Sequence, residues 1–103
     1  MSIFRDEKPL FVPLATVHFN AFDDGSKDTE MRVDGPRWNA TTCRIGRRVT
    51  LSKGYGKWNR IGGKIVSFKR LEWAEVPQTD KAILEACGIA NKPIAYIGIK
   101  KDE

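Results

Sequence analysis

Apolar and polar residues alternate along this chain in short segments whose spacing predicts five strands and two helices. Residues 9–13 (PLFVP) are an apolar run between two prolines, which is typical of an edge strand because proline cannot donate to a sheet ladder. Residues 14–24 instead follow the helical period, and Gly25 is placed to end that helix. Residues 29–33 (TEMRV) then predict a second strand.

The middle of the chain carries turn and strand signals. Residues 34–39 (DGPRWN) have the composition of a turn, which we expect to fold Trp38 inward. Residues 43–52 alternate as in a half-buried strand, with the apolar positions Ile45, Val49 and Leu51. The glycine-rich segment 53–63 (KGYGKWNRIGG) predicts a flexible loop.

The last third of the chain predicts two strands around one helix. Residues 64–73 read as a strand whose imperfect alternation suggests a bulge. A short helix over 80–87 has Thr79 or Asp80 as its expected N-cap. In residues 93–99 (PIAYIGI) apolar residues occupy both the odd and the even positions, which indicates a strand buried on both faces of the sheet. Together these elements predict an α+β fold, a small β-barrel of about five to six strands with two short helices.

Length and composition limit the class of protein. The 103 residues suit one domain, which we place at residues 10–103 after a charged, flexible arm at residues 1–9. Apolar residues make up 41% and charged residues 30%, as in an ordinary globular protein. No apolar run approaches the roughly 18 residues of a membrane span, and the charged N-terminus does not resemble a signal peptide. We therefore expect a cytoplasmic protein with no membrane partner.

The few potential metal ligands and nucleophiles predict neither a metal site nor a cofactor. Cys43 and Cys87 are far apart and form no C-x-x-C pair, so we expect two buried free thiols. His18 is the single histidine, and we expect it to be partly buried and hydrogen-bonded, although a position in a cleft near the motif described below stays open. Zinc needs three or four ligands, which this chain does not supply.

The basic residues are concentrated in one part of the chain. The net charge is +5, and no acidic residue occurs between Asp34 and Glu72, an interval that holds ten of the eighteen lysines and arginines. Such a segment suits a phosphate backbone, and its expected backbone contacts are Arg47, Arg48, Lys53, Lys57 and Arg60. Tyr55 and Trp58 lie among them, where aromatic rings can stack on bases at about 1–3 kcal/mol each or else plug the end of a barrel.

The stretch GSKDTEMR, residues 25–32, gathers polar groups that suit a ligand site. Glu30 and Arg32 are two residues apart on a strand, so they should project to the same side about 6 to 7 Å apart, with Lys27 leaning over them. Two cationic donors and one carboxylate can hold a polar, partly anionic ligand such as a nucleotide. The alternative is a solvated strand face with a weak Glu–Arg pair.

These residues resemble the G-x-K-x-x-E-x-R signature of the ASCH family at Gly25, Lys27, Glu30 and Arg32. LFVPL before a helix, the PRW turn and VTLSKGYG occur in the order shown by small bacterial and phage members, so the resemblance covers about residues 10 to 73. It implies a PUA-like β-barrel, a fold related to RNA-binding modules. It also implies a ligand cleft where the motif lies beside the first helix.

The resemblance implies two kinds of function, ligand binding and hydrolysis. Most ASCH members are inferred to bind RNA or a nucleotide, and for this chain we expect a basic cleft holding such a ligand through Gly25, Lys27, Glu30, Arg32, Tyr55 and Trp58. One branch resembles amidohydrolases of N4-acetylcytidine and other members are reported as ribonucleases, which would make Lys27 and Glu30 catalytic. The amidohydrolase branch uses the motif lysine, a threonine at the position of Glu30 and a glutamate further along the chain. In this chain Glu72 or Glu75 are the candidates for that last glutamate. A basic protein-interaction module is the third alternative, and the oligomeric state stays open.

Overall fold

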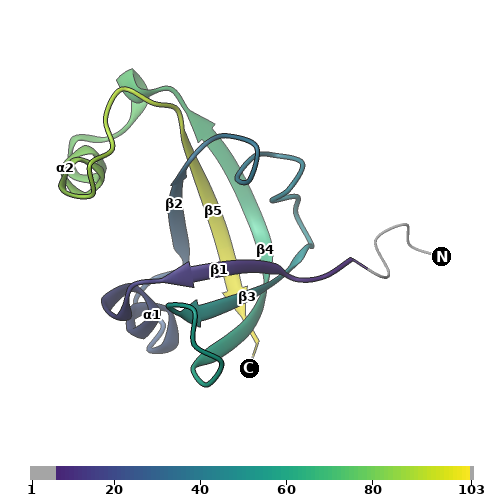
Figure 1. The fold of residues 1–103 in the computed structure, drawn as a ribbon. Coiled ribbons are helices and arrows are strands. Elements are labelled where there is room, and N and C mark those ends of the chain that lie inside the picture. Colours follow the sequence, from purple (N-terminus) through teal and green to yellow (C-terminus); the bar gives the residue numbers. More distant parts are fainter. Residues whose placement is uncertain (1–6, 103) are drawn as a thin grey trace.

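Five strands form one curled sheet in the computed structural model of the protein, which describes residues 7–102 (Figure 1). The strands are ordered β1-β3-β4-β5-β2, and β1 runs parallel to β3 while the other neighbours are antiparallel. In chain order the elements are β1 (Leu10–Leu14), α1 (Thr16–Asp23), β2 (Thr29–Val33), β3 (Arg48–Lys53), β4 (Arg60–Leu71), a 3₁₀ turn η1 (Trp73–Glu75), α2 (Gln78–Ala86) and β5 (Ile94–Lys101). The expected α+β class with five strands and two helices is confirmed.

The sheet curls into a half-barrel whose two end strands, β1 and β2, are joined by a side chain. Arg32 of β2 donates from Nη2 to the carbonyl of Pro13 in β1 at 2.6 Å. Pro13 fits here because β1 is an end strand, as the prolines predicted. In Figure 1 both helices are at the left of the view, with α1 beside β1 and β3 and α2 beyond the other end of β2.

The core consists of two apolar clusters, and β5 contributes to both. The larger cluster lies between the sheet and α1, and its buried members include Val12, Phe22, Leu51, Ile65 and Ile97. The smaller cluster joins α2 to the sheet through Val76, Leu84 and Ile94. Since Ile97 and Ile94 of β5 belong to different clusters, the predicted burial of β5 on both faces is confirmed. Within residues 7–102, no helix combines the length and the apolar character needed to cross a membrane.

The strand expected over residues 43–52 begins only at Arg48, so the prediction for Ile45 was wrong. Ile45 is 69% exposed. Gly46 interrupts the alternation with φ +93° and donates its N–H to the carbonyl of Ile65 at 2.7 Å. The chain therefore turns at Gly46, because a left-handed residue cannot continue a strand.

The glycine-rich loop is shorter than predicted, since β4 begins at Arg60 and includes Gly62 and Gly63. A Cβ added to Gly63 would lie 2.8 Å from the carbonyl oxygen of Lys100 in β5. These glycines are therefore part of the strand, and Gly63 permits a close approach of two backbones. The bulge predicted in this strand is confirmed at Val66, between Ile65 and Ser67.

The helix α2 begins at Gln78, two residues before the predicted start, and neither Thr79 nor Asp80 caps it. Its N-cap residue is Pro77, which makes no side-chain capping bond. The carboxylate of Asp80 instead accepts a hydrogen bond from the Tyr96 hydroxyl at 2.8 Å. Asp80 therefore ties α2 to β5.

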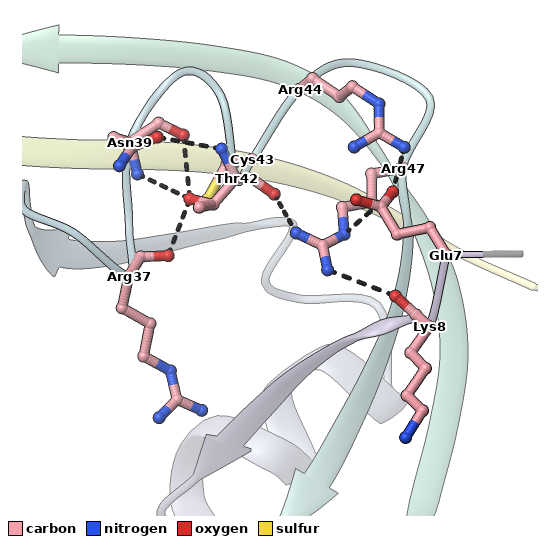
Figure 2. Close-up of polar contacts among 8 residues, drawn as sticks. All are labelled: Glu7, Lys8, Arg37, Asn39, Thr42, Cys43, Arg44 and Arg47. Carbon is pink, nitrogen blue, oxygen red and sulfur yellow. Dashed lines mark hydrogen bonds and ion pairs between the residues drawn. The ribbon is translucent and has the colours of Figure 1, made fainter. Parts of the chain in front are cut away.

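The start of the described chain is held by the loop before β3 (Figure 2). Residues 1–6 of the expected arm lie outside the described residues, whereas Glu7 forms ion pairs with Arg44 and Arg47. Arg47 also donates to the carbonyls of Thr42 at 2.6 Å and of Lys8 at 3.3 Å. Within the loop, the side chain of Asn39 accepts the backbone N–H of Thr42 at 2.9 Å, which helps to hold the residue whose carbonyl receives Arg47.

Candidate functional site

The turn after α1 brings Lys27 back alongside that helix. Gly25 has φ +83°, the left-handed conformation expected where a glycine ends a helix. The N–H of Lys27 then donates to the carbonyl of Ala21 at 3.0 Å. As a result, the ammonium of Lys27 lies 3.2 Å from Nδ1 of His18. An ammonium can only donate, so Nδ1 is the acceptor and the ring proton of a neutral His18 is on Nε2.

Glu30 is the centre of the motif and one of two polar residues buried in the described chain, at 7% exposure. Its Oε1 accepts from Lys27 Nζ at 2.9 Å, and its Oε2 accepts from Arg32 Nε at 2.9 Å. The two-residue spacing on β2 and the turn before it therefore bring the three charged groups together, as the sequence predicted. The alternative of a solvated strand face does not describe a carboxylate with this burial.

Arg32 is fixed on several sides. Its guanidinium bonds Glu30 and the carbonyl of Pro13, and it stacks over the Trp38 ring at 4.7 Å. Trp38 packs against the larger core cluster, so its inward fold was predicted correctly. Stacking and two-sided bonding hold the guanidinium in one orientation, which preorganises its donors for a ligand.

The motif forms the polar wall of a cleft of about 250 Å³. Its polar side chains are His18, Lys27, Glu30 and Arg32, and its apolar lining consists of Pro13, Leu14, Ala15, Met31, Ile83, Leu84, Cys87 and Ile89. Sequence reasoning missed the wall from α2, where the structure leaves Ile83 48% exposed. A cleft with one charged wall and one apolar wall suits a flat ligand with polar edges.

The two cysteines differ in their surroundings. Cys43 is a buried free thiol, as expected, and burial raises its pKa. Cys87 is exposed, so the expectation of a buried thiol was wrong for this residue. It follows the last residue of α2, where the short helix presents it to the cleft rather than to the core.

The aromatic residues proposed as stacking partners lie outside this cleft. Tyr55 is 79% exposed and Trp58 is 92% exposed, both in the loop between β3 and β4. Tyr55 contacts Phe11 with ring centroids 6.0 Å apart. The loop begins beside the cleft, because Gly54 donates to the carbonyl of Leu14 at 2.9 Å.

The five expected backbone contacts separate into two groups. Arg47 and Arg48 are at the start of β3, whereas Lys53 ends that strand about 17 Å away. Arg47 holds Glu7, so it is part of the scaffold. Lys53 and Arg60 flank the exposed loop, and Lys57 lies within it. This second group begins beside the cleft, because Lys53 is paired with Leu14, which lines the cleft.

Neither Glu72 nor Glu75 lines the cleft. Glu72 precedes the 3₁₀ turn and Glu75 ends it, and the side chain of Glu75 accepts the N–H of Glu72 at 3.0 Å. Gly25 also lies outside the cleft and lines a neighbouring hollow with Lys27. Among residues 7–102, no cluster of three or more histidine, cysteine or acidic side chains could hold a metal ion. Comparison with known proteins found no matching family model and no matching curated protein.

Proposed function

We propose that the protein binds a nucleotide or a nucleotide unit of RNA, with the base in the cleft between the motif and α2. The observation that supports this best is the buried Glu30, which is held between Lys27 and Arg32 in a cleft that the apolar side chain of Ile83 also lines. A base offers polar edges to such a wall and a flat face to the other. The cluster of one carboxylate and two cations keeps a net positive charge, which favours a ligand with phosphate.

Lys27 is better placed for binding than for catalysis. A lysine attacks or removes a proton only when its amine is neutral. Here the ammonium donates to Glu30 at 2.9 Å and faces His18 at 3.2 Å, so two of its three donors are engaged. The third is available to a ligand oxygen. The hydrolase alternative also loses support because its candidate glutamates lie outside the cleft.

The proposal is tested by blocking the cleft without removing its ion pairs. Replacing both cations would leave Glu30 buried and unpaired, which by itself costs about 3–5 kcal/mol of stability. Ile83→Glu avoids that problem, since Ile83 is half exposed and the new carboxylate would repel phosphate at the mouth of the cleft. Val17→Glu is the matched control, because Val17 is 70% exposed on α1 and does not line the cleft.

Both variants are titrated with a fluorescent single-stranded RNA at two salt concentrations and with a nucleoside monophosphate. We expect Ile83→Glu to weaken binding of both ligands at least tenfold and Val17→Glu to bind like wild type. Wild type should bind RNA less tightly at the higher salt concentration. Equal binding by the two variants would place the ligand elsewhere. Release of acetate from N4-acetylcytidine, abolished in Lys27→Gln, would instead establish the hydrolase.

A further inference from the structure

Three cationic side chains form a ladder across the outer face of the sheet. Arg48 of β3 is directly opposite Lys64 of β4, and Lys64 is directly opposite Lys100 of β5. Residues paired in register share a face with their Cβ atoms about 5 Å apart, and like charges in this arrangement destabilise a sheet. All three side chains are exposed, so the ladder faces outward.

One carboxylate compensates part of this charge. Asp102 accepts a hydrogen bond from Arg48 Nη1 at 3.0 Å. The pair lies over β4 at Gly62, where an added Cβ would be 2.7 Å from Asp102 Oδ2. Lys64 and Lys100 form no ion pair with an acidic group between residues 7 and 102. Two neighbouring positive charges therefore remain for an external anion.

The ladder is continuous with the motif cleft. The charged residues that line a hollow of about 380 Å³ beside the cleft are three lysines and one aspartate, namely Lys27, Lys100, Lys101 and Asp28. Gly98 of β5 and the bulge residue Val66 of β4 also line this hollow. A second hollow of about 330 Å³ is lined by Lys100 and Lys101 together with Arg48 and Lys64. Shared residues thus connect the cleft with the ladder.

We propose that this track, from Lys27 through Lys100 and Lys64 to Arg48, binds the phosphodiester backbone of a single-stranded RNA. The inference rests on the proposed function, because the base of the same strand would occupy the cleft. The track begins at the turn that leads into β2 and then crosses β5, β4 and β3. From β2 to β3 there are three strand spacings, or about 14 Å. A row of cations of this length suits regularly spaced phosphates, and a mononucleotide is too short to occupy it.

The test compares a long and a short ligand on charge-removed variants. Lys64→Gln/Lys100→Gln removes two charges from exposed positions and relieves repulsion, so we expect the fold to be retained. The control Lys69→Gln/Lys92→Gln removes two charges near the other end of the β4–β5 pair. Each protein is titrated with a fluorescent twelve-nucleotide poly-uridine at several salt concentrations and with uridine monophosphate by equilibrium dialysis.

We expect the slope of log K against log salt for the twelve-mer to become shallower by about 1.4 in the ladder variant, since each phosphate contact of a single strand contributes about 0.7. The control should keep the wild-type slope, and all three proteins should bind uridine monophosphate equally. If the ladder variant kept the wild-type slope and still bound uridine monophosphate, the track would be overturned and the proposed cleft function would stand. A reduced slope without uridine monophosphate binding would support the ladder as a backbone site and overturn the proposed cleft function. No binding of the twelve-mer to wild type would overturn the track.

Discussion

The most informative single substitution is Glu30→Gln, because it removes the charge from the centre of the motif and keeps the shape of the side chain. Each carboxylate oxygen of Glu30 accepts from a different cation, Lys27 at Oε1 and Arg32 at Oε2. A glutamine has one acceptor oxygen, so in either orientation its NH₂ group faces one of the two cations. The substitution therefore breaks one interaction and leaves two positive charges side by side.

The size of the effect follows from burial. Hydrogen bonds to charged groups contribute about 1.5–3 kcal/mol each, and exposed ion pairs about 0–1 kcal/mol. The Glu30 side chain is 9% exposed while its two partners are 22% exposed. We take an intermediate value and expect Glu30→Gln to lower the free energy of unfolding by about 2 kcal/mol. For a domain of this size that corresponds to about 8–16 °C in Tm.

Urea and thermal unfolding, followed by tryptophan fluorescence, measure this loss. Glu85→Gln is the control, since Glu85 is an exposed glutamate on α2 and surface substitutions usually change stability by less than about 0.5 kcal/mol. If Glu30→Gln and Glu85→Gln unfold at the same urea concentration, the three charges are not coupled. The two ion pairs of Glu30 would then contribute nothing measurable to the fold, and the proposed cleft would lose the rigid polar wall on which it depends.

Three further predictions concern the scaffold and the thiols. Gly63→Ala should destabilise the protein by about 1–3 kcal/mol in urea unfolding, because its methyl group would meet the β5 backbone at 2.8 Å. Tyr96→Phe should cost about 1 kcal/mol by losing the hydrogen bond to Asp80. Burial and this hydrogen bond raise the pKa of Tyr96 to about 12. The contribution of the hydroxyl to stability should therefore be present below pH 10 and lost as the pH rises towards 12. Alkaline unfolding of wild type and Tyr96→Phe would measure this loss. Alkylation at pH 8 should modify Cys87 in the native protein and Cys43 only after unfolding, as read by mass spectrometry.

Each of these predictions has a contrary result. Gly35→Ala should be nearly neutral, since no atom lies within 4 Å of an added Cβ and Gly35 needs no left-handed φ. Equal losses for the Gly35 and Gly63 variants would argue against a specific close approach. An identical alkaline unfolding curve for Tyr96→Phe would show that the hydroxyl is not stabilised by Asp80. Rapid native alkylation of Cys43 would contradict its burial.

Features set by local spacing were predictable from the sequence. The two-residue separation of Glu30 and Arg32 decides that they share a face of β2, and Gly25 marks the end of α1. The inward turn of Trp38 was also a local inference, from the PRW turn at residues 36–38. In each case the signal lies within a few residues of the feature it predicts.

Contacts between distant segments could not be predicted in the same way. Arg47 was expected to contact phosphate because it is an arginine in the basic segment. Its role in the scaffold instead depends on its ion pair with Glu7, which is forty residues earlier in the chain. Gly63 lies in a glycine-rich segment that predicted a loop. Its place in β4 depends instead on the close approach of β5, which is almost forty residues later in the chain. The α2 wall of the cleft likewise requires the smaller core cluster to form. Periodicity contains none of this information.

The central claim is that a nucleotide occupies the cleft between the motif and α2, and Cys87 offers a direct probe of it. This thiol is exposed at the cleft, whereas the other thiol in the chain is buried. The rate of Cys87 alkylation should be measured with and without saturating single-stranded RNA, while fluorescence anisotropy reports that the RNA is bound. We predict that bound RNA slows alkylation at least fivefold and that Ile83→Glu abolishes this protection. An unchanged alkylation rate on fully bound protein would contradict the account, because the ligand would then lie elsewhere.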